Sequence, residues 1–212
     1  MRQSADLTGL APRTGIVKST KPNIAESVEK VMLLLDWSGS MEAGMDPHSS
    51  YAHGGEPTRK DVVRDGVIAI TAASEPSITA YGVTLFSEHG YTLVDYTTNY
   101  LKAQAFRDIR SLSTMLDEGL RKSLEGTPNR IILLSDGAAS CGVEAVIVYV
   151  VEAIQRHIII DTIAIGGADD TLLRDIAERT GGVFVRANCA EDLIEHFEKL
   201  ETRAYALLED HT

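Results

Sequence analysis

Short, almost uninterrupted apolar runs alternate with longer segments of helical periodicity from about residue 28 onward, and this alternation constrains the fold most. Apolar runs of this kind are typical of strands that are buried on both faces of a parallel sheet. The clearest runs are residues 31–35, 131–134 and 158–165, which we interpret as central strands. Parallel neighbours need a crossover of a dozen or more residues, usually a helix. The pattern therefore predicts one doubly wound α/β domain.

The other predicted elements fit around these strands. Residues 78–86 form another apolar strand, and a turn at 88–90 leads so directly into residues 91–95 that the pair must be an antiparallel hairpin at a sheet edge. Residues 183–185 form a last short strand. Helices are predicted at 58–73, 100–110, 115–124, 143–157, 171–180 and 191–208. The segment 143–157 is rich in β-branched residues, but the crossover requires a helix there. The last helix should bury a face made of Leu193, Phe197, Leu200, Ala204 and Leu207.

The domain is expected to span residues 28–208, after a flexible or docking arm at 1–27 and before a short tail at 209–212. A chain of 212 residues with 44% apolar and 24% charged side chains is long enough for one complete core and is not disordered overall.

A formal charge of −11 disfavours binding to nucleic acids and to anionic membranes, because both need clustered Lys and Arg. The sequence shows no signal peptide and no apolar stretch of membrane-spanning length, so we expect a cytoplasmic protein. Cys141 and Cys189 make neither a disulfide framework nor a metal-binding pair, and we expect both to be free thiols.

Small oxygen-bearing side chains follow two of the predicted central strands. Asp36, Ser38 and Ser40 come directly after the first strand, and Asp136 follows the strand 131–134. Thr114 lies in the loop that enters the helix 115–124. In open α/β sheets, ligands bind beyond the carboxyl ends of the strands, where the strand order reverses. Two carboxylates and several hydroxyls, without His or Cys, suit a hard divalent cation, and Mg²⁺ is favoured over Mn²⁺ or Ca²⁺.

In this order the residues resemble the metal-ion-dependent adhesion site (MIDAS) of the von Willebrand factor A (VWA) domains, which is written DxSxS, then Thr, then Asp. The resemblance covers about residues 28–200 and includes the order of the elements. It implies a three-layer, Rossmann-like fold with a mostly parallel sheet and one antiparallel edge strand. It also implies that Ser38 and Ser40 bind the metal directly and that Thr114 binds it directly or through water. Asp36 and Asp136 would act through bridging waters and orient the hydroxyls.

Each of these residues also has a simpler interpretation. Ser38 and Ser40 could cap the helix that follows them, Thr114 could cap the helix 115–124 together with Asp117, and Asp136 could end a strand in a turn. The joint pattern favours the metal site over these alternatives. One departure from the family is that Leu112-Ser113 stands where Gly-Gly often precedes the Thr.

The segment 42–57 is unusually long for a connection beside such a site, which suggests a role in partner recognition. Trp37 could line an apolar rim around the metal or pack under this loop. His48 and His53 could be solvated side chains rather than ligands of a second metal. The candidate partner-binding residues are Trp37, Met41, Met45, His48, Tyr51 and His53.

The resemblance implies a non-enzymatic, metal-dependent protein-binding module whose metal accepts an Asp or Glu of the partner. Relatives of this kind are adaptors for MoxR-type AAA+ ATPases or members of tellurite-resistance and stress systems. One alternative is a metal-dependent hydrolase or phosphoryl-transfer enzyme. Against it, Ser38 stands where a haloacid-dehalogenase-like enzyme needs a second carboxylate, and no GxxxxGK[ST] loop is present. The other alternative is a purely structural scaffold of the same family.

Overall fold

The computed structural model describes residues 28–45, 56–106, 113–189, 191–197 and 199. The elements run in the order β1 (Glu29–Asp36), 3-10 helix η1 (Gly39–Glu42), α1 (Arg59–Ala73), β2 (Thr79–Phe86), β3 (Gly90–Thr97), α2 (Tyr100–Ala103), α3 (Leu116–Glu125), β4 (Arg130–Ser135), α4 (Val143–Gln155), β5 (Ile159–Ala164), α5 (Asp170–Thr180) and β6 (Phe184–Arg186). Residues 191–197 are helical.

The six strands form one sheet in the order β3-β2-β1-β4-β5-β6. All neighbouring strands are parallel except β3, which pairs antiparallel with β2 at one edge. The chain winds outward from β1 in one direction and from β4 in the other, so the order reverses between these two strands. The doubly wound sheet with an antiparallel edge strand confirms the predicted fold class. It also places the carboxyl ends of β1 and β4 side by side.

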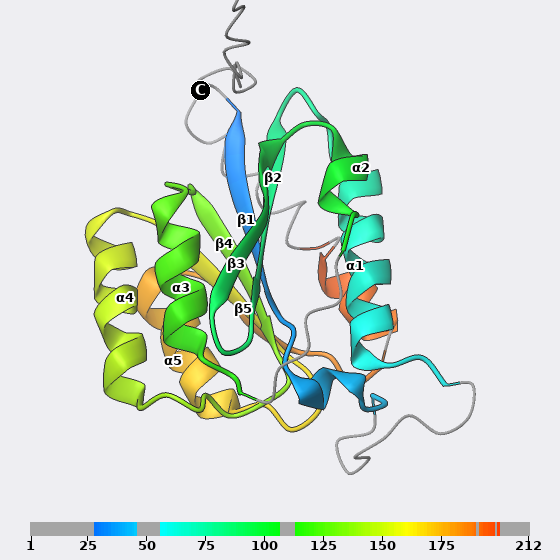
Figure 1. The fold of residues 1–212 in the computed structure, drawn as a ribbon. Coiled ribbons are helices and arrows are strands. Elements are labelled where there is room, and N and C mark those ends of the chain that lie inside the picture. The colour runs from blue at the N-terminus through cyan, green and yellow to red at the C-terminus, as the bar shows by residue number, and fades with distance from the viewer. Residues whose placement is uncertain (1–27, 46–55, 107–112, 190, 198, 200–212) are drawn as a thin grey trace, which may run out of the picture.

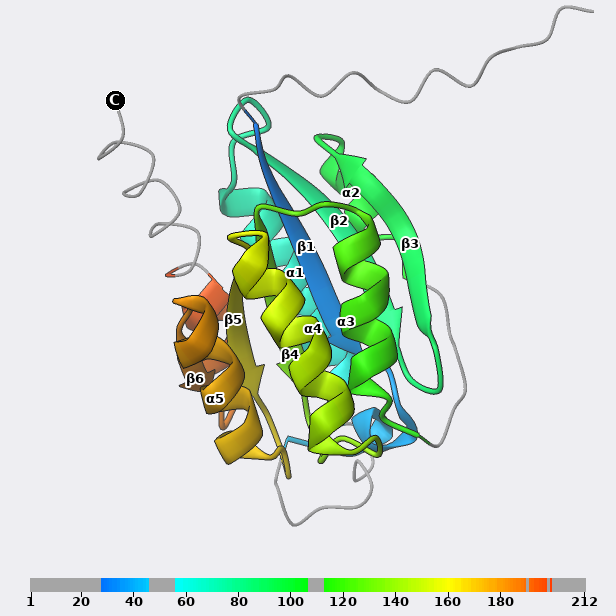
Figure 2. The ribbon, with the colours of Figure 1, turned by 90° about the vertical axis from the view of Figure 1, so that its left-hand side faces the viewer.

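Helices cover both faces of the sheet, as Figures 1 and 2 show. Helices α3, α4 and α5 pack on one face over a core that includes Met32, Leu34 and Ile131. Helices α1 and α2 and the helical residues 191–197 cover the other face, where Leu33 and Leu35 belong to the core. Alternate residues of β1 thus belong to opposite cores. This alternation explains why the apolar run of β1 is continuous in the sequence.

The helix α2 is the element that the sequence predicted least well. A helix was expected over residues 100–110, but α2 ends at Ala103, and residues 107–110 lie outside the described part of the chain. After α2, the Gln104 amide donates to Thr71 Oγ1 of α1 over 2.8 Å, and Phe106 stacks on Trp37. These tertiary contacts fix the chain in a non-helical path, which local periodicity does not reveal.

The remaining elements lie within a few residues of their predicted positions. The segment 143–157 is helical as α4 despite its β-branched residues, and it ends at Gln155. In the last helix, Leu193 and Phe197 are fully buried as expected, whereas Leu200, Ala204 and Leu207 lie outside the described residues. The arm 1–27 and the tail 209–212 also lie outside them.

Both cysteines are free, as predicted, and both are half-buried. They follow β4 and β6, which are separated by β5 in the sheet. Within the part of the chain that the structure describes, every helix is too short or too polar to cross a lipid bilayer.

Candidate functional site

The predicted site residues meet where β1 and β4 end. Asp36 is the last residue of β1 and Ser135 the last of β4, and the preceding residues of these strands pair in register. The Asp36 carboxylate is fully buried and accepts hydrogen bonds from the backbone N–H of Ser38 over 2.9 Å and from Ser135 Oγ over 2.8 Å. Asp36 thus fixes the turn after β1 and connects it to β4.

A chain of hydroxyl and carboxylate oxygens extends from this turn. Ser38 Oγ lies 2.9 Å from Ser40 Oγ, and Ser40 Oγ donates to Asp136 Oδ1 over 2.7 Å. A hydroxyl group that donates a hydrogen bond to a carboxylate keeps its oxygen lone pairs available for another donor or for a cation. Ser38 and Asp136 are buried, whereas Ser40 is exposed. The oxygen chain therefore has a buried base and one side that faces solvent.

Thr114 approaches the same place from a third loop. Its backbone N–H donates to Ser140 Oγ over 3.1 Å and its carbonyl accepts from the Ser140 N–H over 2.8 Å, so it is tied to the loop after β4. A Cβ added to Gly137 would lie 3.6 Å from Thr114 Oγ1 and 3.9 Å from Ser40 Oγ. Both oxygens thus border the same small space, which the absence of a side chain at Gly137 leaves open.

Burial and the charge of Asp136 both disfavour the ionised form of Asp36. Burial, followed by the charge of Asp136, raises the pKa of Asp36 to about 6, and the hydrogen bonds from Ser38 and Ser135 oppose this rise. A buried pair of like charges is favourable for a cation placed between or near them. The two carboxylates therefore favour a positive charge at the site, and a nearby guanidinium, that of Arg59, already supplies part of it.

Two residues with contacts at the site had no assigned role in the sequence prediction. Ser135 orients Asp36, as described above, and its position directly before Asp136 was the only signal for it. Arg59, the first residue of α1, is buried, and its Nη1 lies 2.7 Å from Asp136 Oδ2 and 3.3 Å from the carbonyl of Ser40. An arginine at a helix start gives no sequence signal for burial beside a carboxylate of another loop.

The capping alternatives for Ser38 and Thr114 have no side-chain hydrogen bond in their support. Asp136 does lie in a bend directly after β4, as its simpler interpretation expects. Ser38 precedes η1 and Met115 precedes α3, but neither side chain caps its helix. Thr114 is therefore not the residue that caps α3. The polar side chains after β1 and β4 instead bond to one another.

The candidate partner-binding residues fall into two groups. Trp37 and Met41 are fully buried, which agrees with the alternative that Trp37 packs inside the protein and is contrary to a role in an exposed rim. Trp37 stacks on Phe106 with ring centroids 5.2 Å apart. Met45 is half-buried against the same core. The other three candidates, His48, Tyr51 and His53, lie outside the described residues.

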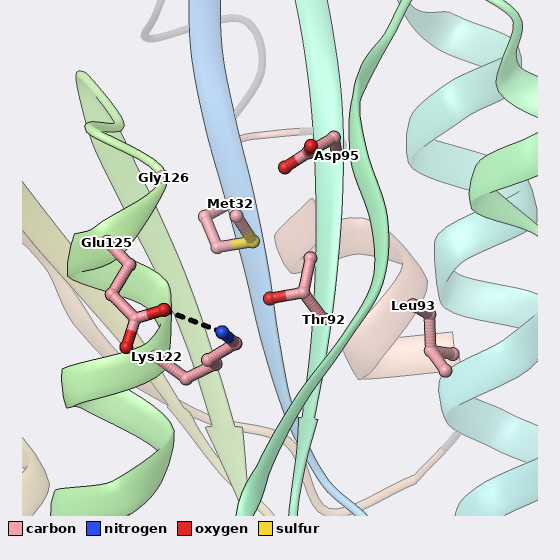
Figure 3. Close-up of a pocket in the computed structure, with 7 residues that line it drawn as sticks. All are labelled: Met32, Thr92, Leu93, Asp95, Lys122, Glu125 and Gly126. Atoms are coloured by element: carbon pink, nitrogen blue, oxygen red, sulfur yellow. Dashed lines mark hydrogen bonds and ion pairs between the residues drawn. The ribbon is translucent and has the colours of Figure 1, made fainter. Parts of the chain in front are cut away.

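A separate pocket lies between α3 and the strands β1 and β3 (Figure 3). The ion pair between Lys122 and Glu125 borders it, with Met32 and Asp95 on other walls. The pocket shares no residue with the oxygen cluster at the ends of β1 and β4. It therefore does not extend the candidate site.

The donor set determines which metals the cluster could hold. Among the described residues, no three His, Cys, Asp or Glu side chains gather as a metal site, so a site rich in acids or imidazoles is not found there. The oxygen cluster holds only two carboxylates, and its other side-chain donors are neutral hydroxyls. Hydroxyl and carboxylate oxygens fit a hard cation and do not fit a soft one.

Comparisons with known proteins agree with the fold. The model of the von Willebrand factor type A domain family matches residues 30–199. No curated protein matches the chain significantly.

Several solved structures share this fold at low sequence identity. BatB from Bacteroides thetaiotaomicron is 14% identical with a TM-score of 0.63, and the match covers 84% of this chain and 99% of BatB. A von Willebrand factor type A protein from Catenulispora acidiphila is 16% identical with a TM-score of 0.68, over 84% of this chain and 43% of that one. Proximal thread matrix protein 1 of the mussel byssus, whose MIDAS motif is occupied by zinc, is 18% identical with a TM-score of 0.63, over 82% of this chain and 46% of its own.

Proposed function

Because this chain belongs to the von Willebrand factor type A family, whose domains commonly mediate protein–protein interaction, we propose that it is a non-enzymatic protein-binding module that depends on a divalent metal. The observation that supports this most is the cluster of oxygens from three loops: Ser38 and Ser40 after β1, Thr114 before α3 and Asp136 after β4. Their chemistry fits a hard cation, and we propose Mg²⁺.

The residues divide into two roles in this proposal. Ser38, Ser40 and Thr114 would present neutral oxygens to the metal. Asp136 accepts a hydrogen bond from the Ser40 hydroxyl, and Asp36 holds the turn through the Ser38 N–H, so the two carboxylates orient the donors and balance the charge. A site with few charged ligands leaves the ion electron-poor. The bound ion would supply an open coordination position for a carboxylate from an Asp or Glu of the partner protein.

The exposure of the site supports binding of a macromolecule rather than a small molecule. Ser40 is at the surface and both carboxylates are buried, so a partner can reach the oxygen cluster from the side of Ser40. The zinc-occupied motif in the mussel protein supports metal binding by this kind of site. We further propose a cytoplasmic adaptor that works within a larger assembly, with a MoxR-type AAA+ ATPase or a tellurite or stress-response system as the partner.

Titration calorimetry with Mg²⁺ tests the metal site directly. The wild type should bind one ion, Ser38→Ala and Thr114→Ala should bind at least about tenfold more weakly, and Ser123→Ala should bind like the wild type. Ser123 is a matched control because it is a buried serine on α3 that touches none of the site residues in the contacts described above. Equal binding by all four proteins would contradict the proposed ligands.

A second experiment tests the dependence of the interaction on the metal. In a pull-down with the wild-type protein as bait, partner proteins that bind in Mg²⁺ should no longer bind when a chelator is added. They should also fail to bind when Asp36→Ala or Ser38→Ala is the bait. A partner that is retained under all of these conditions would show that the interaction uses another surface. The Ser123→Ala protein serves again as the control.

A further inference from the structure

The buried ion pair between Arg59 and Asp136 places a permanent positive charge beside the candidate metal site. Arg59 Nη1 lies 2.7 Å from Asp136 Oδ2, while the other oxygen of the same carboxylate accepts from Ser40 Oγ over 2.7 Å. The Arg59 side chain is 5% exposed and that of Asp136 is 0% exposed. Charges in so buried a position are screened little by salt.

The position of the guanidinium is fixed from several sides. The backbone N–H of Arg59 donates to the carbonyl of Ala43, which joins the start of α1 to the loop after β1. Nη1 also donates to the carbonyl of Ser40 over 3.3 Å. The loop after β5 also contacts the guanidinium, because Gly166 packs so closely that a Cβ there would lie 2.4 Å from Arg59 Cζ. Arg186 in turn donates to the Gly166 carbonyl over 2.9 Å and holds that loop in place.

The charge balance has a direct consequence for a cation. Asp36 and Asp136 alone would offer two negative charges, but Arg59 reduces the net charge of the buried cluster to minus one when both acids are ionised. A divalent ion bound beside them would then leave a net positive charge. Without Arg59, the same ion would leave the cluster neutral.

We propose that Arg59 is a built-in counter-charge that weakens metal binding by the cluster and leaves the metal-loaded site positive, so that it favours an anionic partner group. This proposal rests on the proposed function, because it concerns the regulation of the same site. Arg59 acts on the cation through Asp136 and through its charge, and is therefore a positioning residue rather than a ligand. The metal and the carboxylate of the partner would in this way bind cooperatively.

The test separates the effect of the positive charge at residue 59 on Mg²⁺ binding from the effect of the side chain's shape. Arg59→Gln removes the charge and keeps a hydrogen-bond donor, whereas Arg59→Lys keeps the charge and loses the planar fork. Titration with Mg²⁺ alone should show about tenfold tighter binding by Arg59→Gln, and binding within about threefold of the wild type by Arg59→Lys. Arg64→Gln is the matched control, since Arg64 lies on the same helix and pairs with Asp61, and should bind Mg²⁺ like the wild type.

A second pair of variants keeps the test valid if Arg59→Gln alone unfolds because Asp136 is left unpaired. Asp136→Asn leaves the guanidinium without its counter-charge, and the double variant Arg59→Gln/Asp136→Asn removes both charges. Circular dichroism in chelator establishes that each protein is folded, and the rise in melting temperature with Mg²⁺ measures binding. The double variant should be stabilised by Mg²⁺ at lower concentrations than Asp136→Asn.

The outcomes separate this inference from the proposed function. If the wild type binds Mg²⁺ and Arg59→Gln binds it equally or more weakly, Arg59 only supports the structure and the inference is wrong. If Arg59→Gln binds Mg²⁺ and the wild type does not, the inference is supported in its strongest form. If neither the wild type nor any variant binds Mg²⁺, the proposed metal site fails and the inference fails with it.

Discussion

The guanidinium of Arg59 packs against Gly166 so closely that no side chain fits between them. A Cβ at Gly166 would lie 2.4 Å from Cζ and 2.6 Å from Nη2 of Arg59. Gly166 also has a φ of 50°, in the left-handed region that side chains disfavour. The contact joins the loop after β5 to the first residue of α1.

Gly166→Ala should therefore be more destabilising than Gly181→Ala. Gly181 also has a positive φ, 77°, but no atom lies within 4 Å of its added Cβ. The backbone cost of about 1 kcal/mol is common to both variants, and the overlap with Arg59 adds at least about another 1 kcal/mol at Gly166. Chemical denaturation measures both free energies of unfolding. Equal losses would show that the guanidinium moves aside without cost.

The buried carboxylate of Asp36 should make stability depend on pH in the metal-free protein. Its pKa is about 6 in the folded state and 3.8 in an ordinary environment, so the folded protein binds this proton more tightly than the unfolded chain. The resulting penalty is absent below about pH 4 and complete above about pH 6. At neutral pH it amounts to roughly 3 kcal/mol.

The comparison of the wild type with Asp36→Asn isolates this contribution. In chelator, the free energy of unfolding of Asp36→Asn relative to the wild type should increase by roughly 3 kcal/mol as the pH rises from 4 to 7. Urea denaturation at several pH values provides the measurement. A difference that stays constant over this range would mean that Asp36 titrates normally.

The start of α1 should depend on a capping box. Thr58 Oγ1 accepts from the Asp61 N–H over 3.2 Å, and Asp61 Oδ2 accepts from the Thr58 N–H over 3.0 Å. Thr58→Ala should cost about 1 kcal/mol of stability, whereas Thr58→Ser should keep most of it. The hydrogen bond from Thr58 also lowers the pKa of Asp61, so in Thr58→Ala this pKa should rise toward its usual value. An NMR titration of the Asp61 carboxyl would detect this, and an unchanged pKa would contradict the box.

Phe197 should anchor the helical residues 191–197 to the domain. Its ring is fully buried, and a Cβ at Gly66 of α1 would lie 2.7 Å from it. Phe197→Ala should cost about 3–5 kcal/mol because it empties this contact. Val148→Ala on α4 is the control, since Val148 is 61% exposed and should change stability by less than about 0.5 kcal/mol. Similar small losses in both variants would show that the last helix is not part of the core.

The sequence predicted those features that follow from local periodicity and from the general rule for parallel sheets. Continuous apolar runs revealed β1, β4 and β5, and the rule that ligands bind beyond strand ends brought Asp36 together with Asp136. The short α2 and the burial of Trp37 were not evident locally, because both involve contacts between distant segments, such as the Gln104–Thr71 hydrogen bond and the stacking of Phe106 on Trp37. Nothing in the sequence indicated Arg59 either, because its burial depends on the loops after β1, β4 and β5, which meet only in the folded chain.

Asp36 and Asp136 are neighbours only because β1 pairs with β4. Ser135, whose hydroxyl donates a hydrogen bond to Asp36, lies 99 positions further along the sequence. A contact between residues so far apart in sequence is slow to form during folding, because the chain between them loses conformational entropy when the loop closes. Neither half of the polypeptide can assemble the cluster by itself. Cation uptake by the whole cluster would therefore report that the centre of the sheet is complete, since a nascent chain still lacking β4 would also lack Asp136.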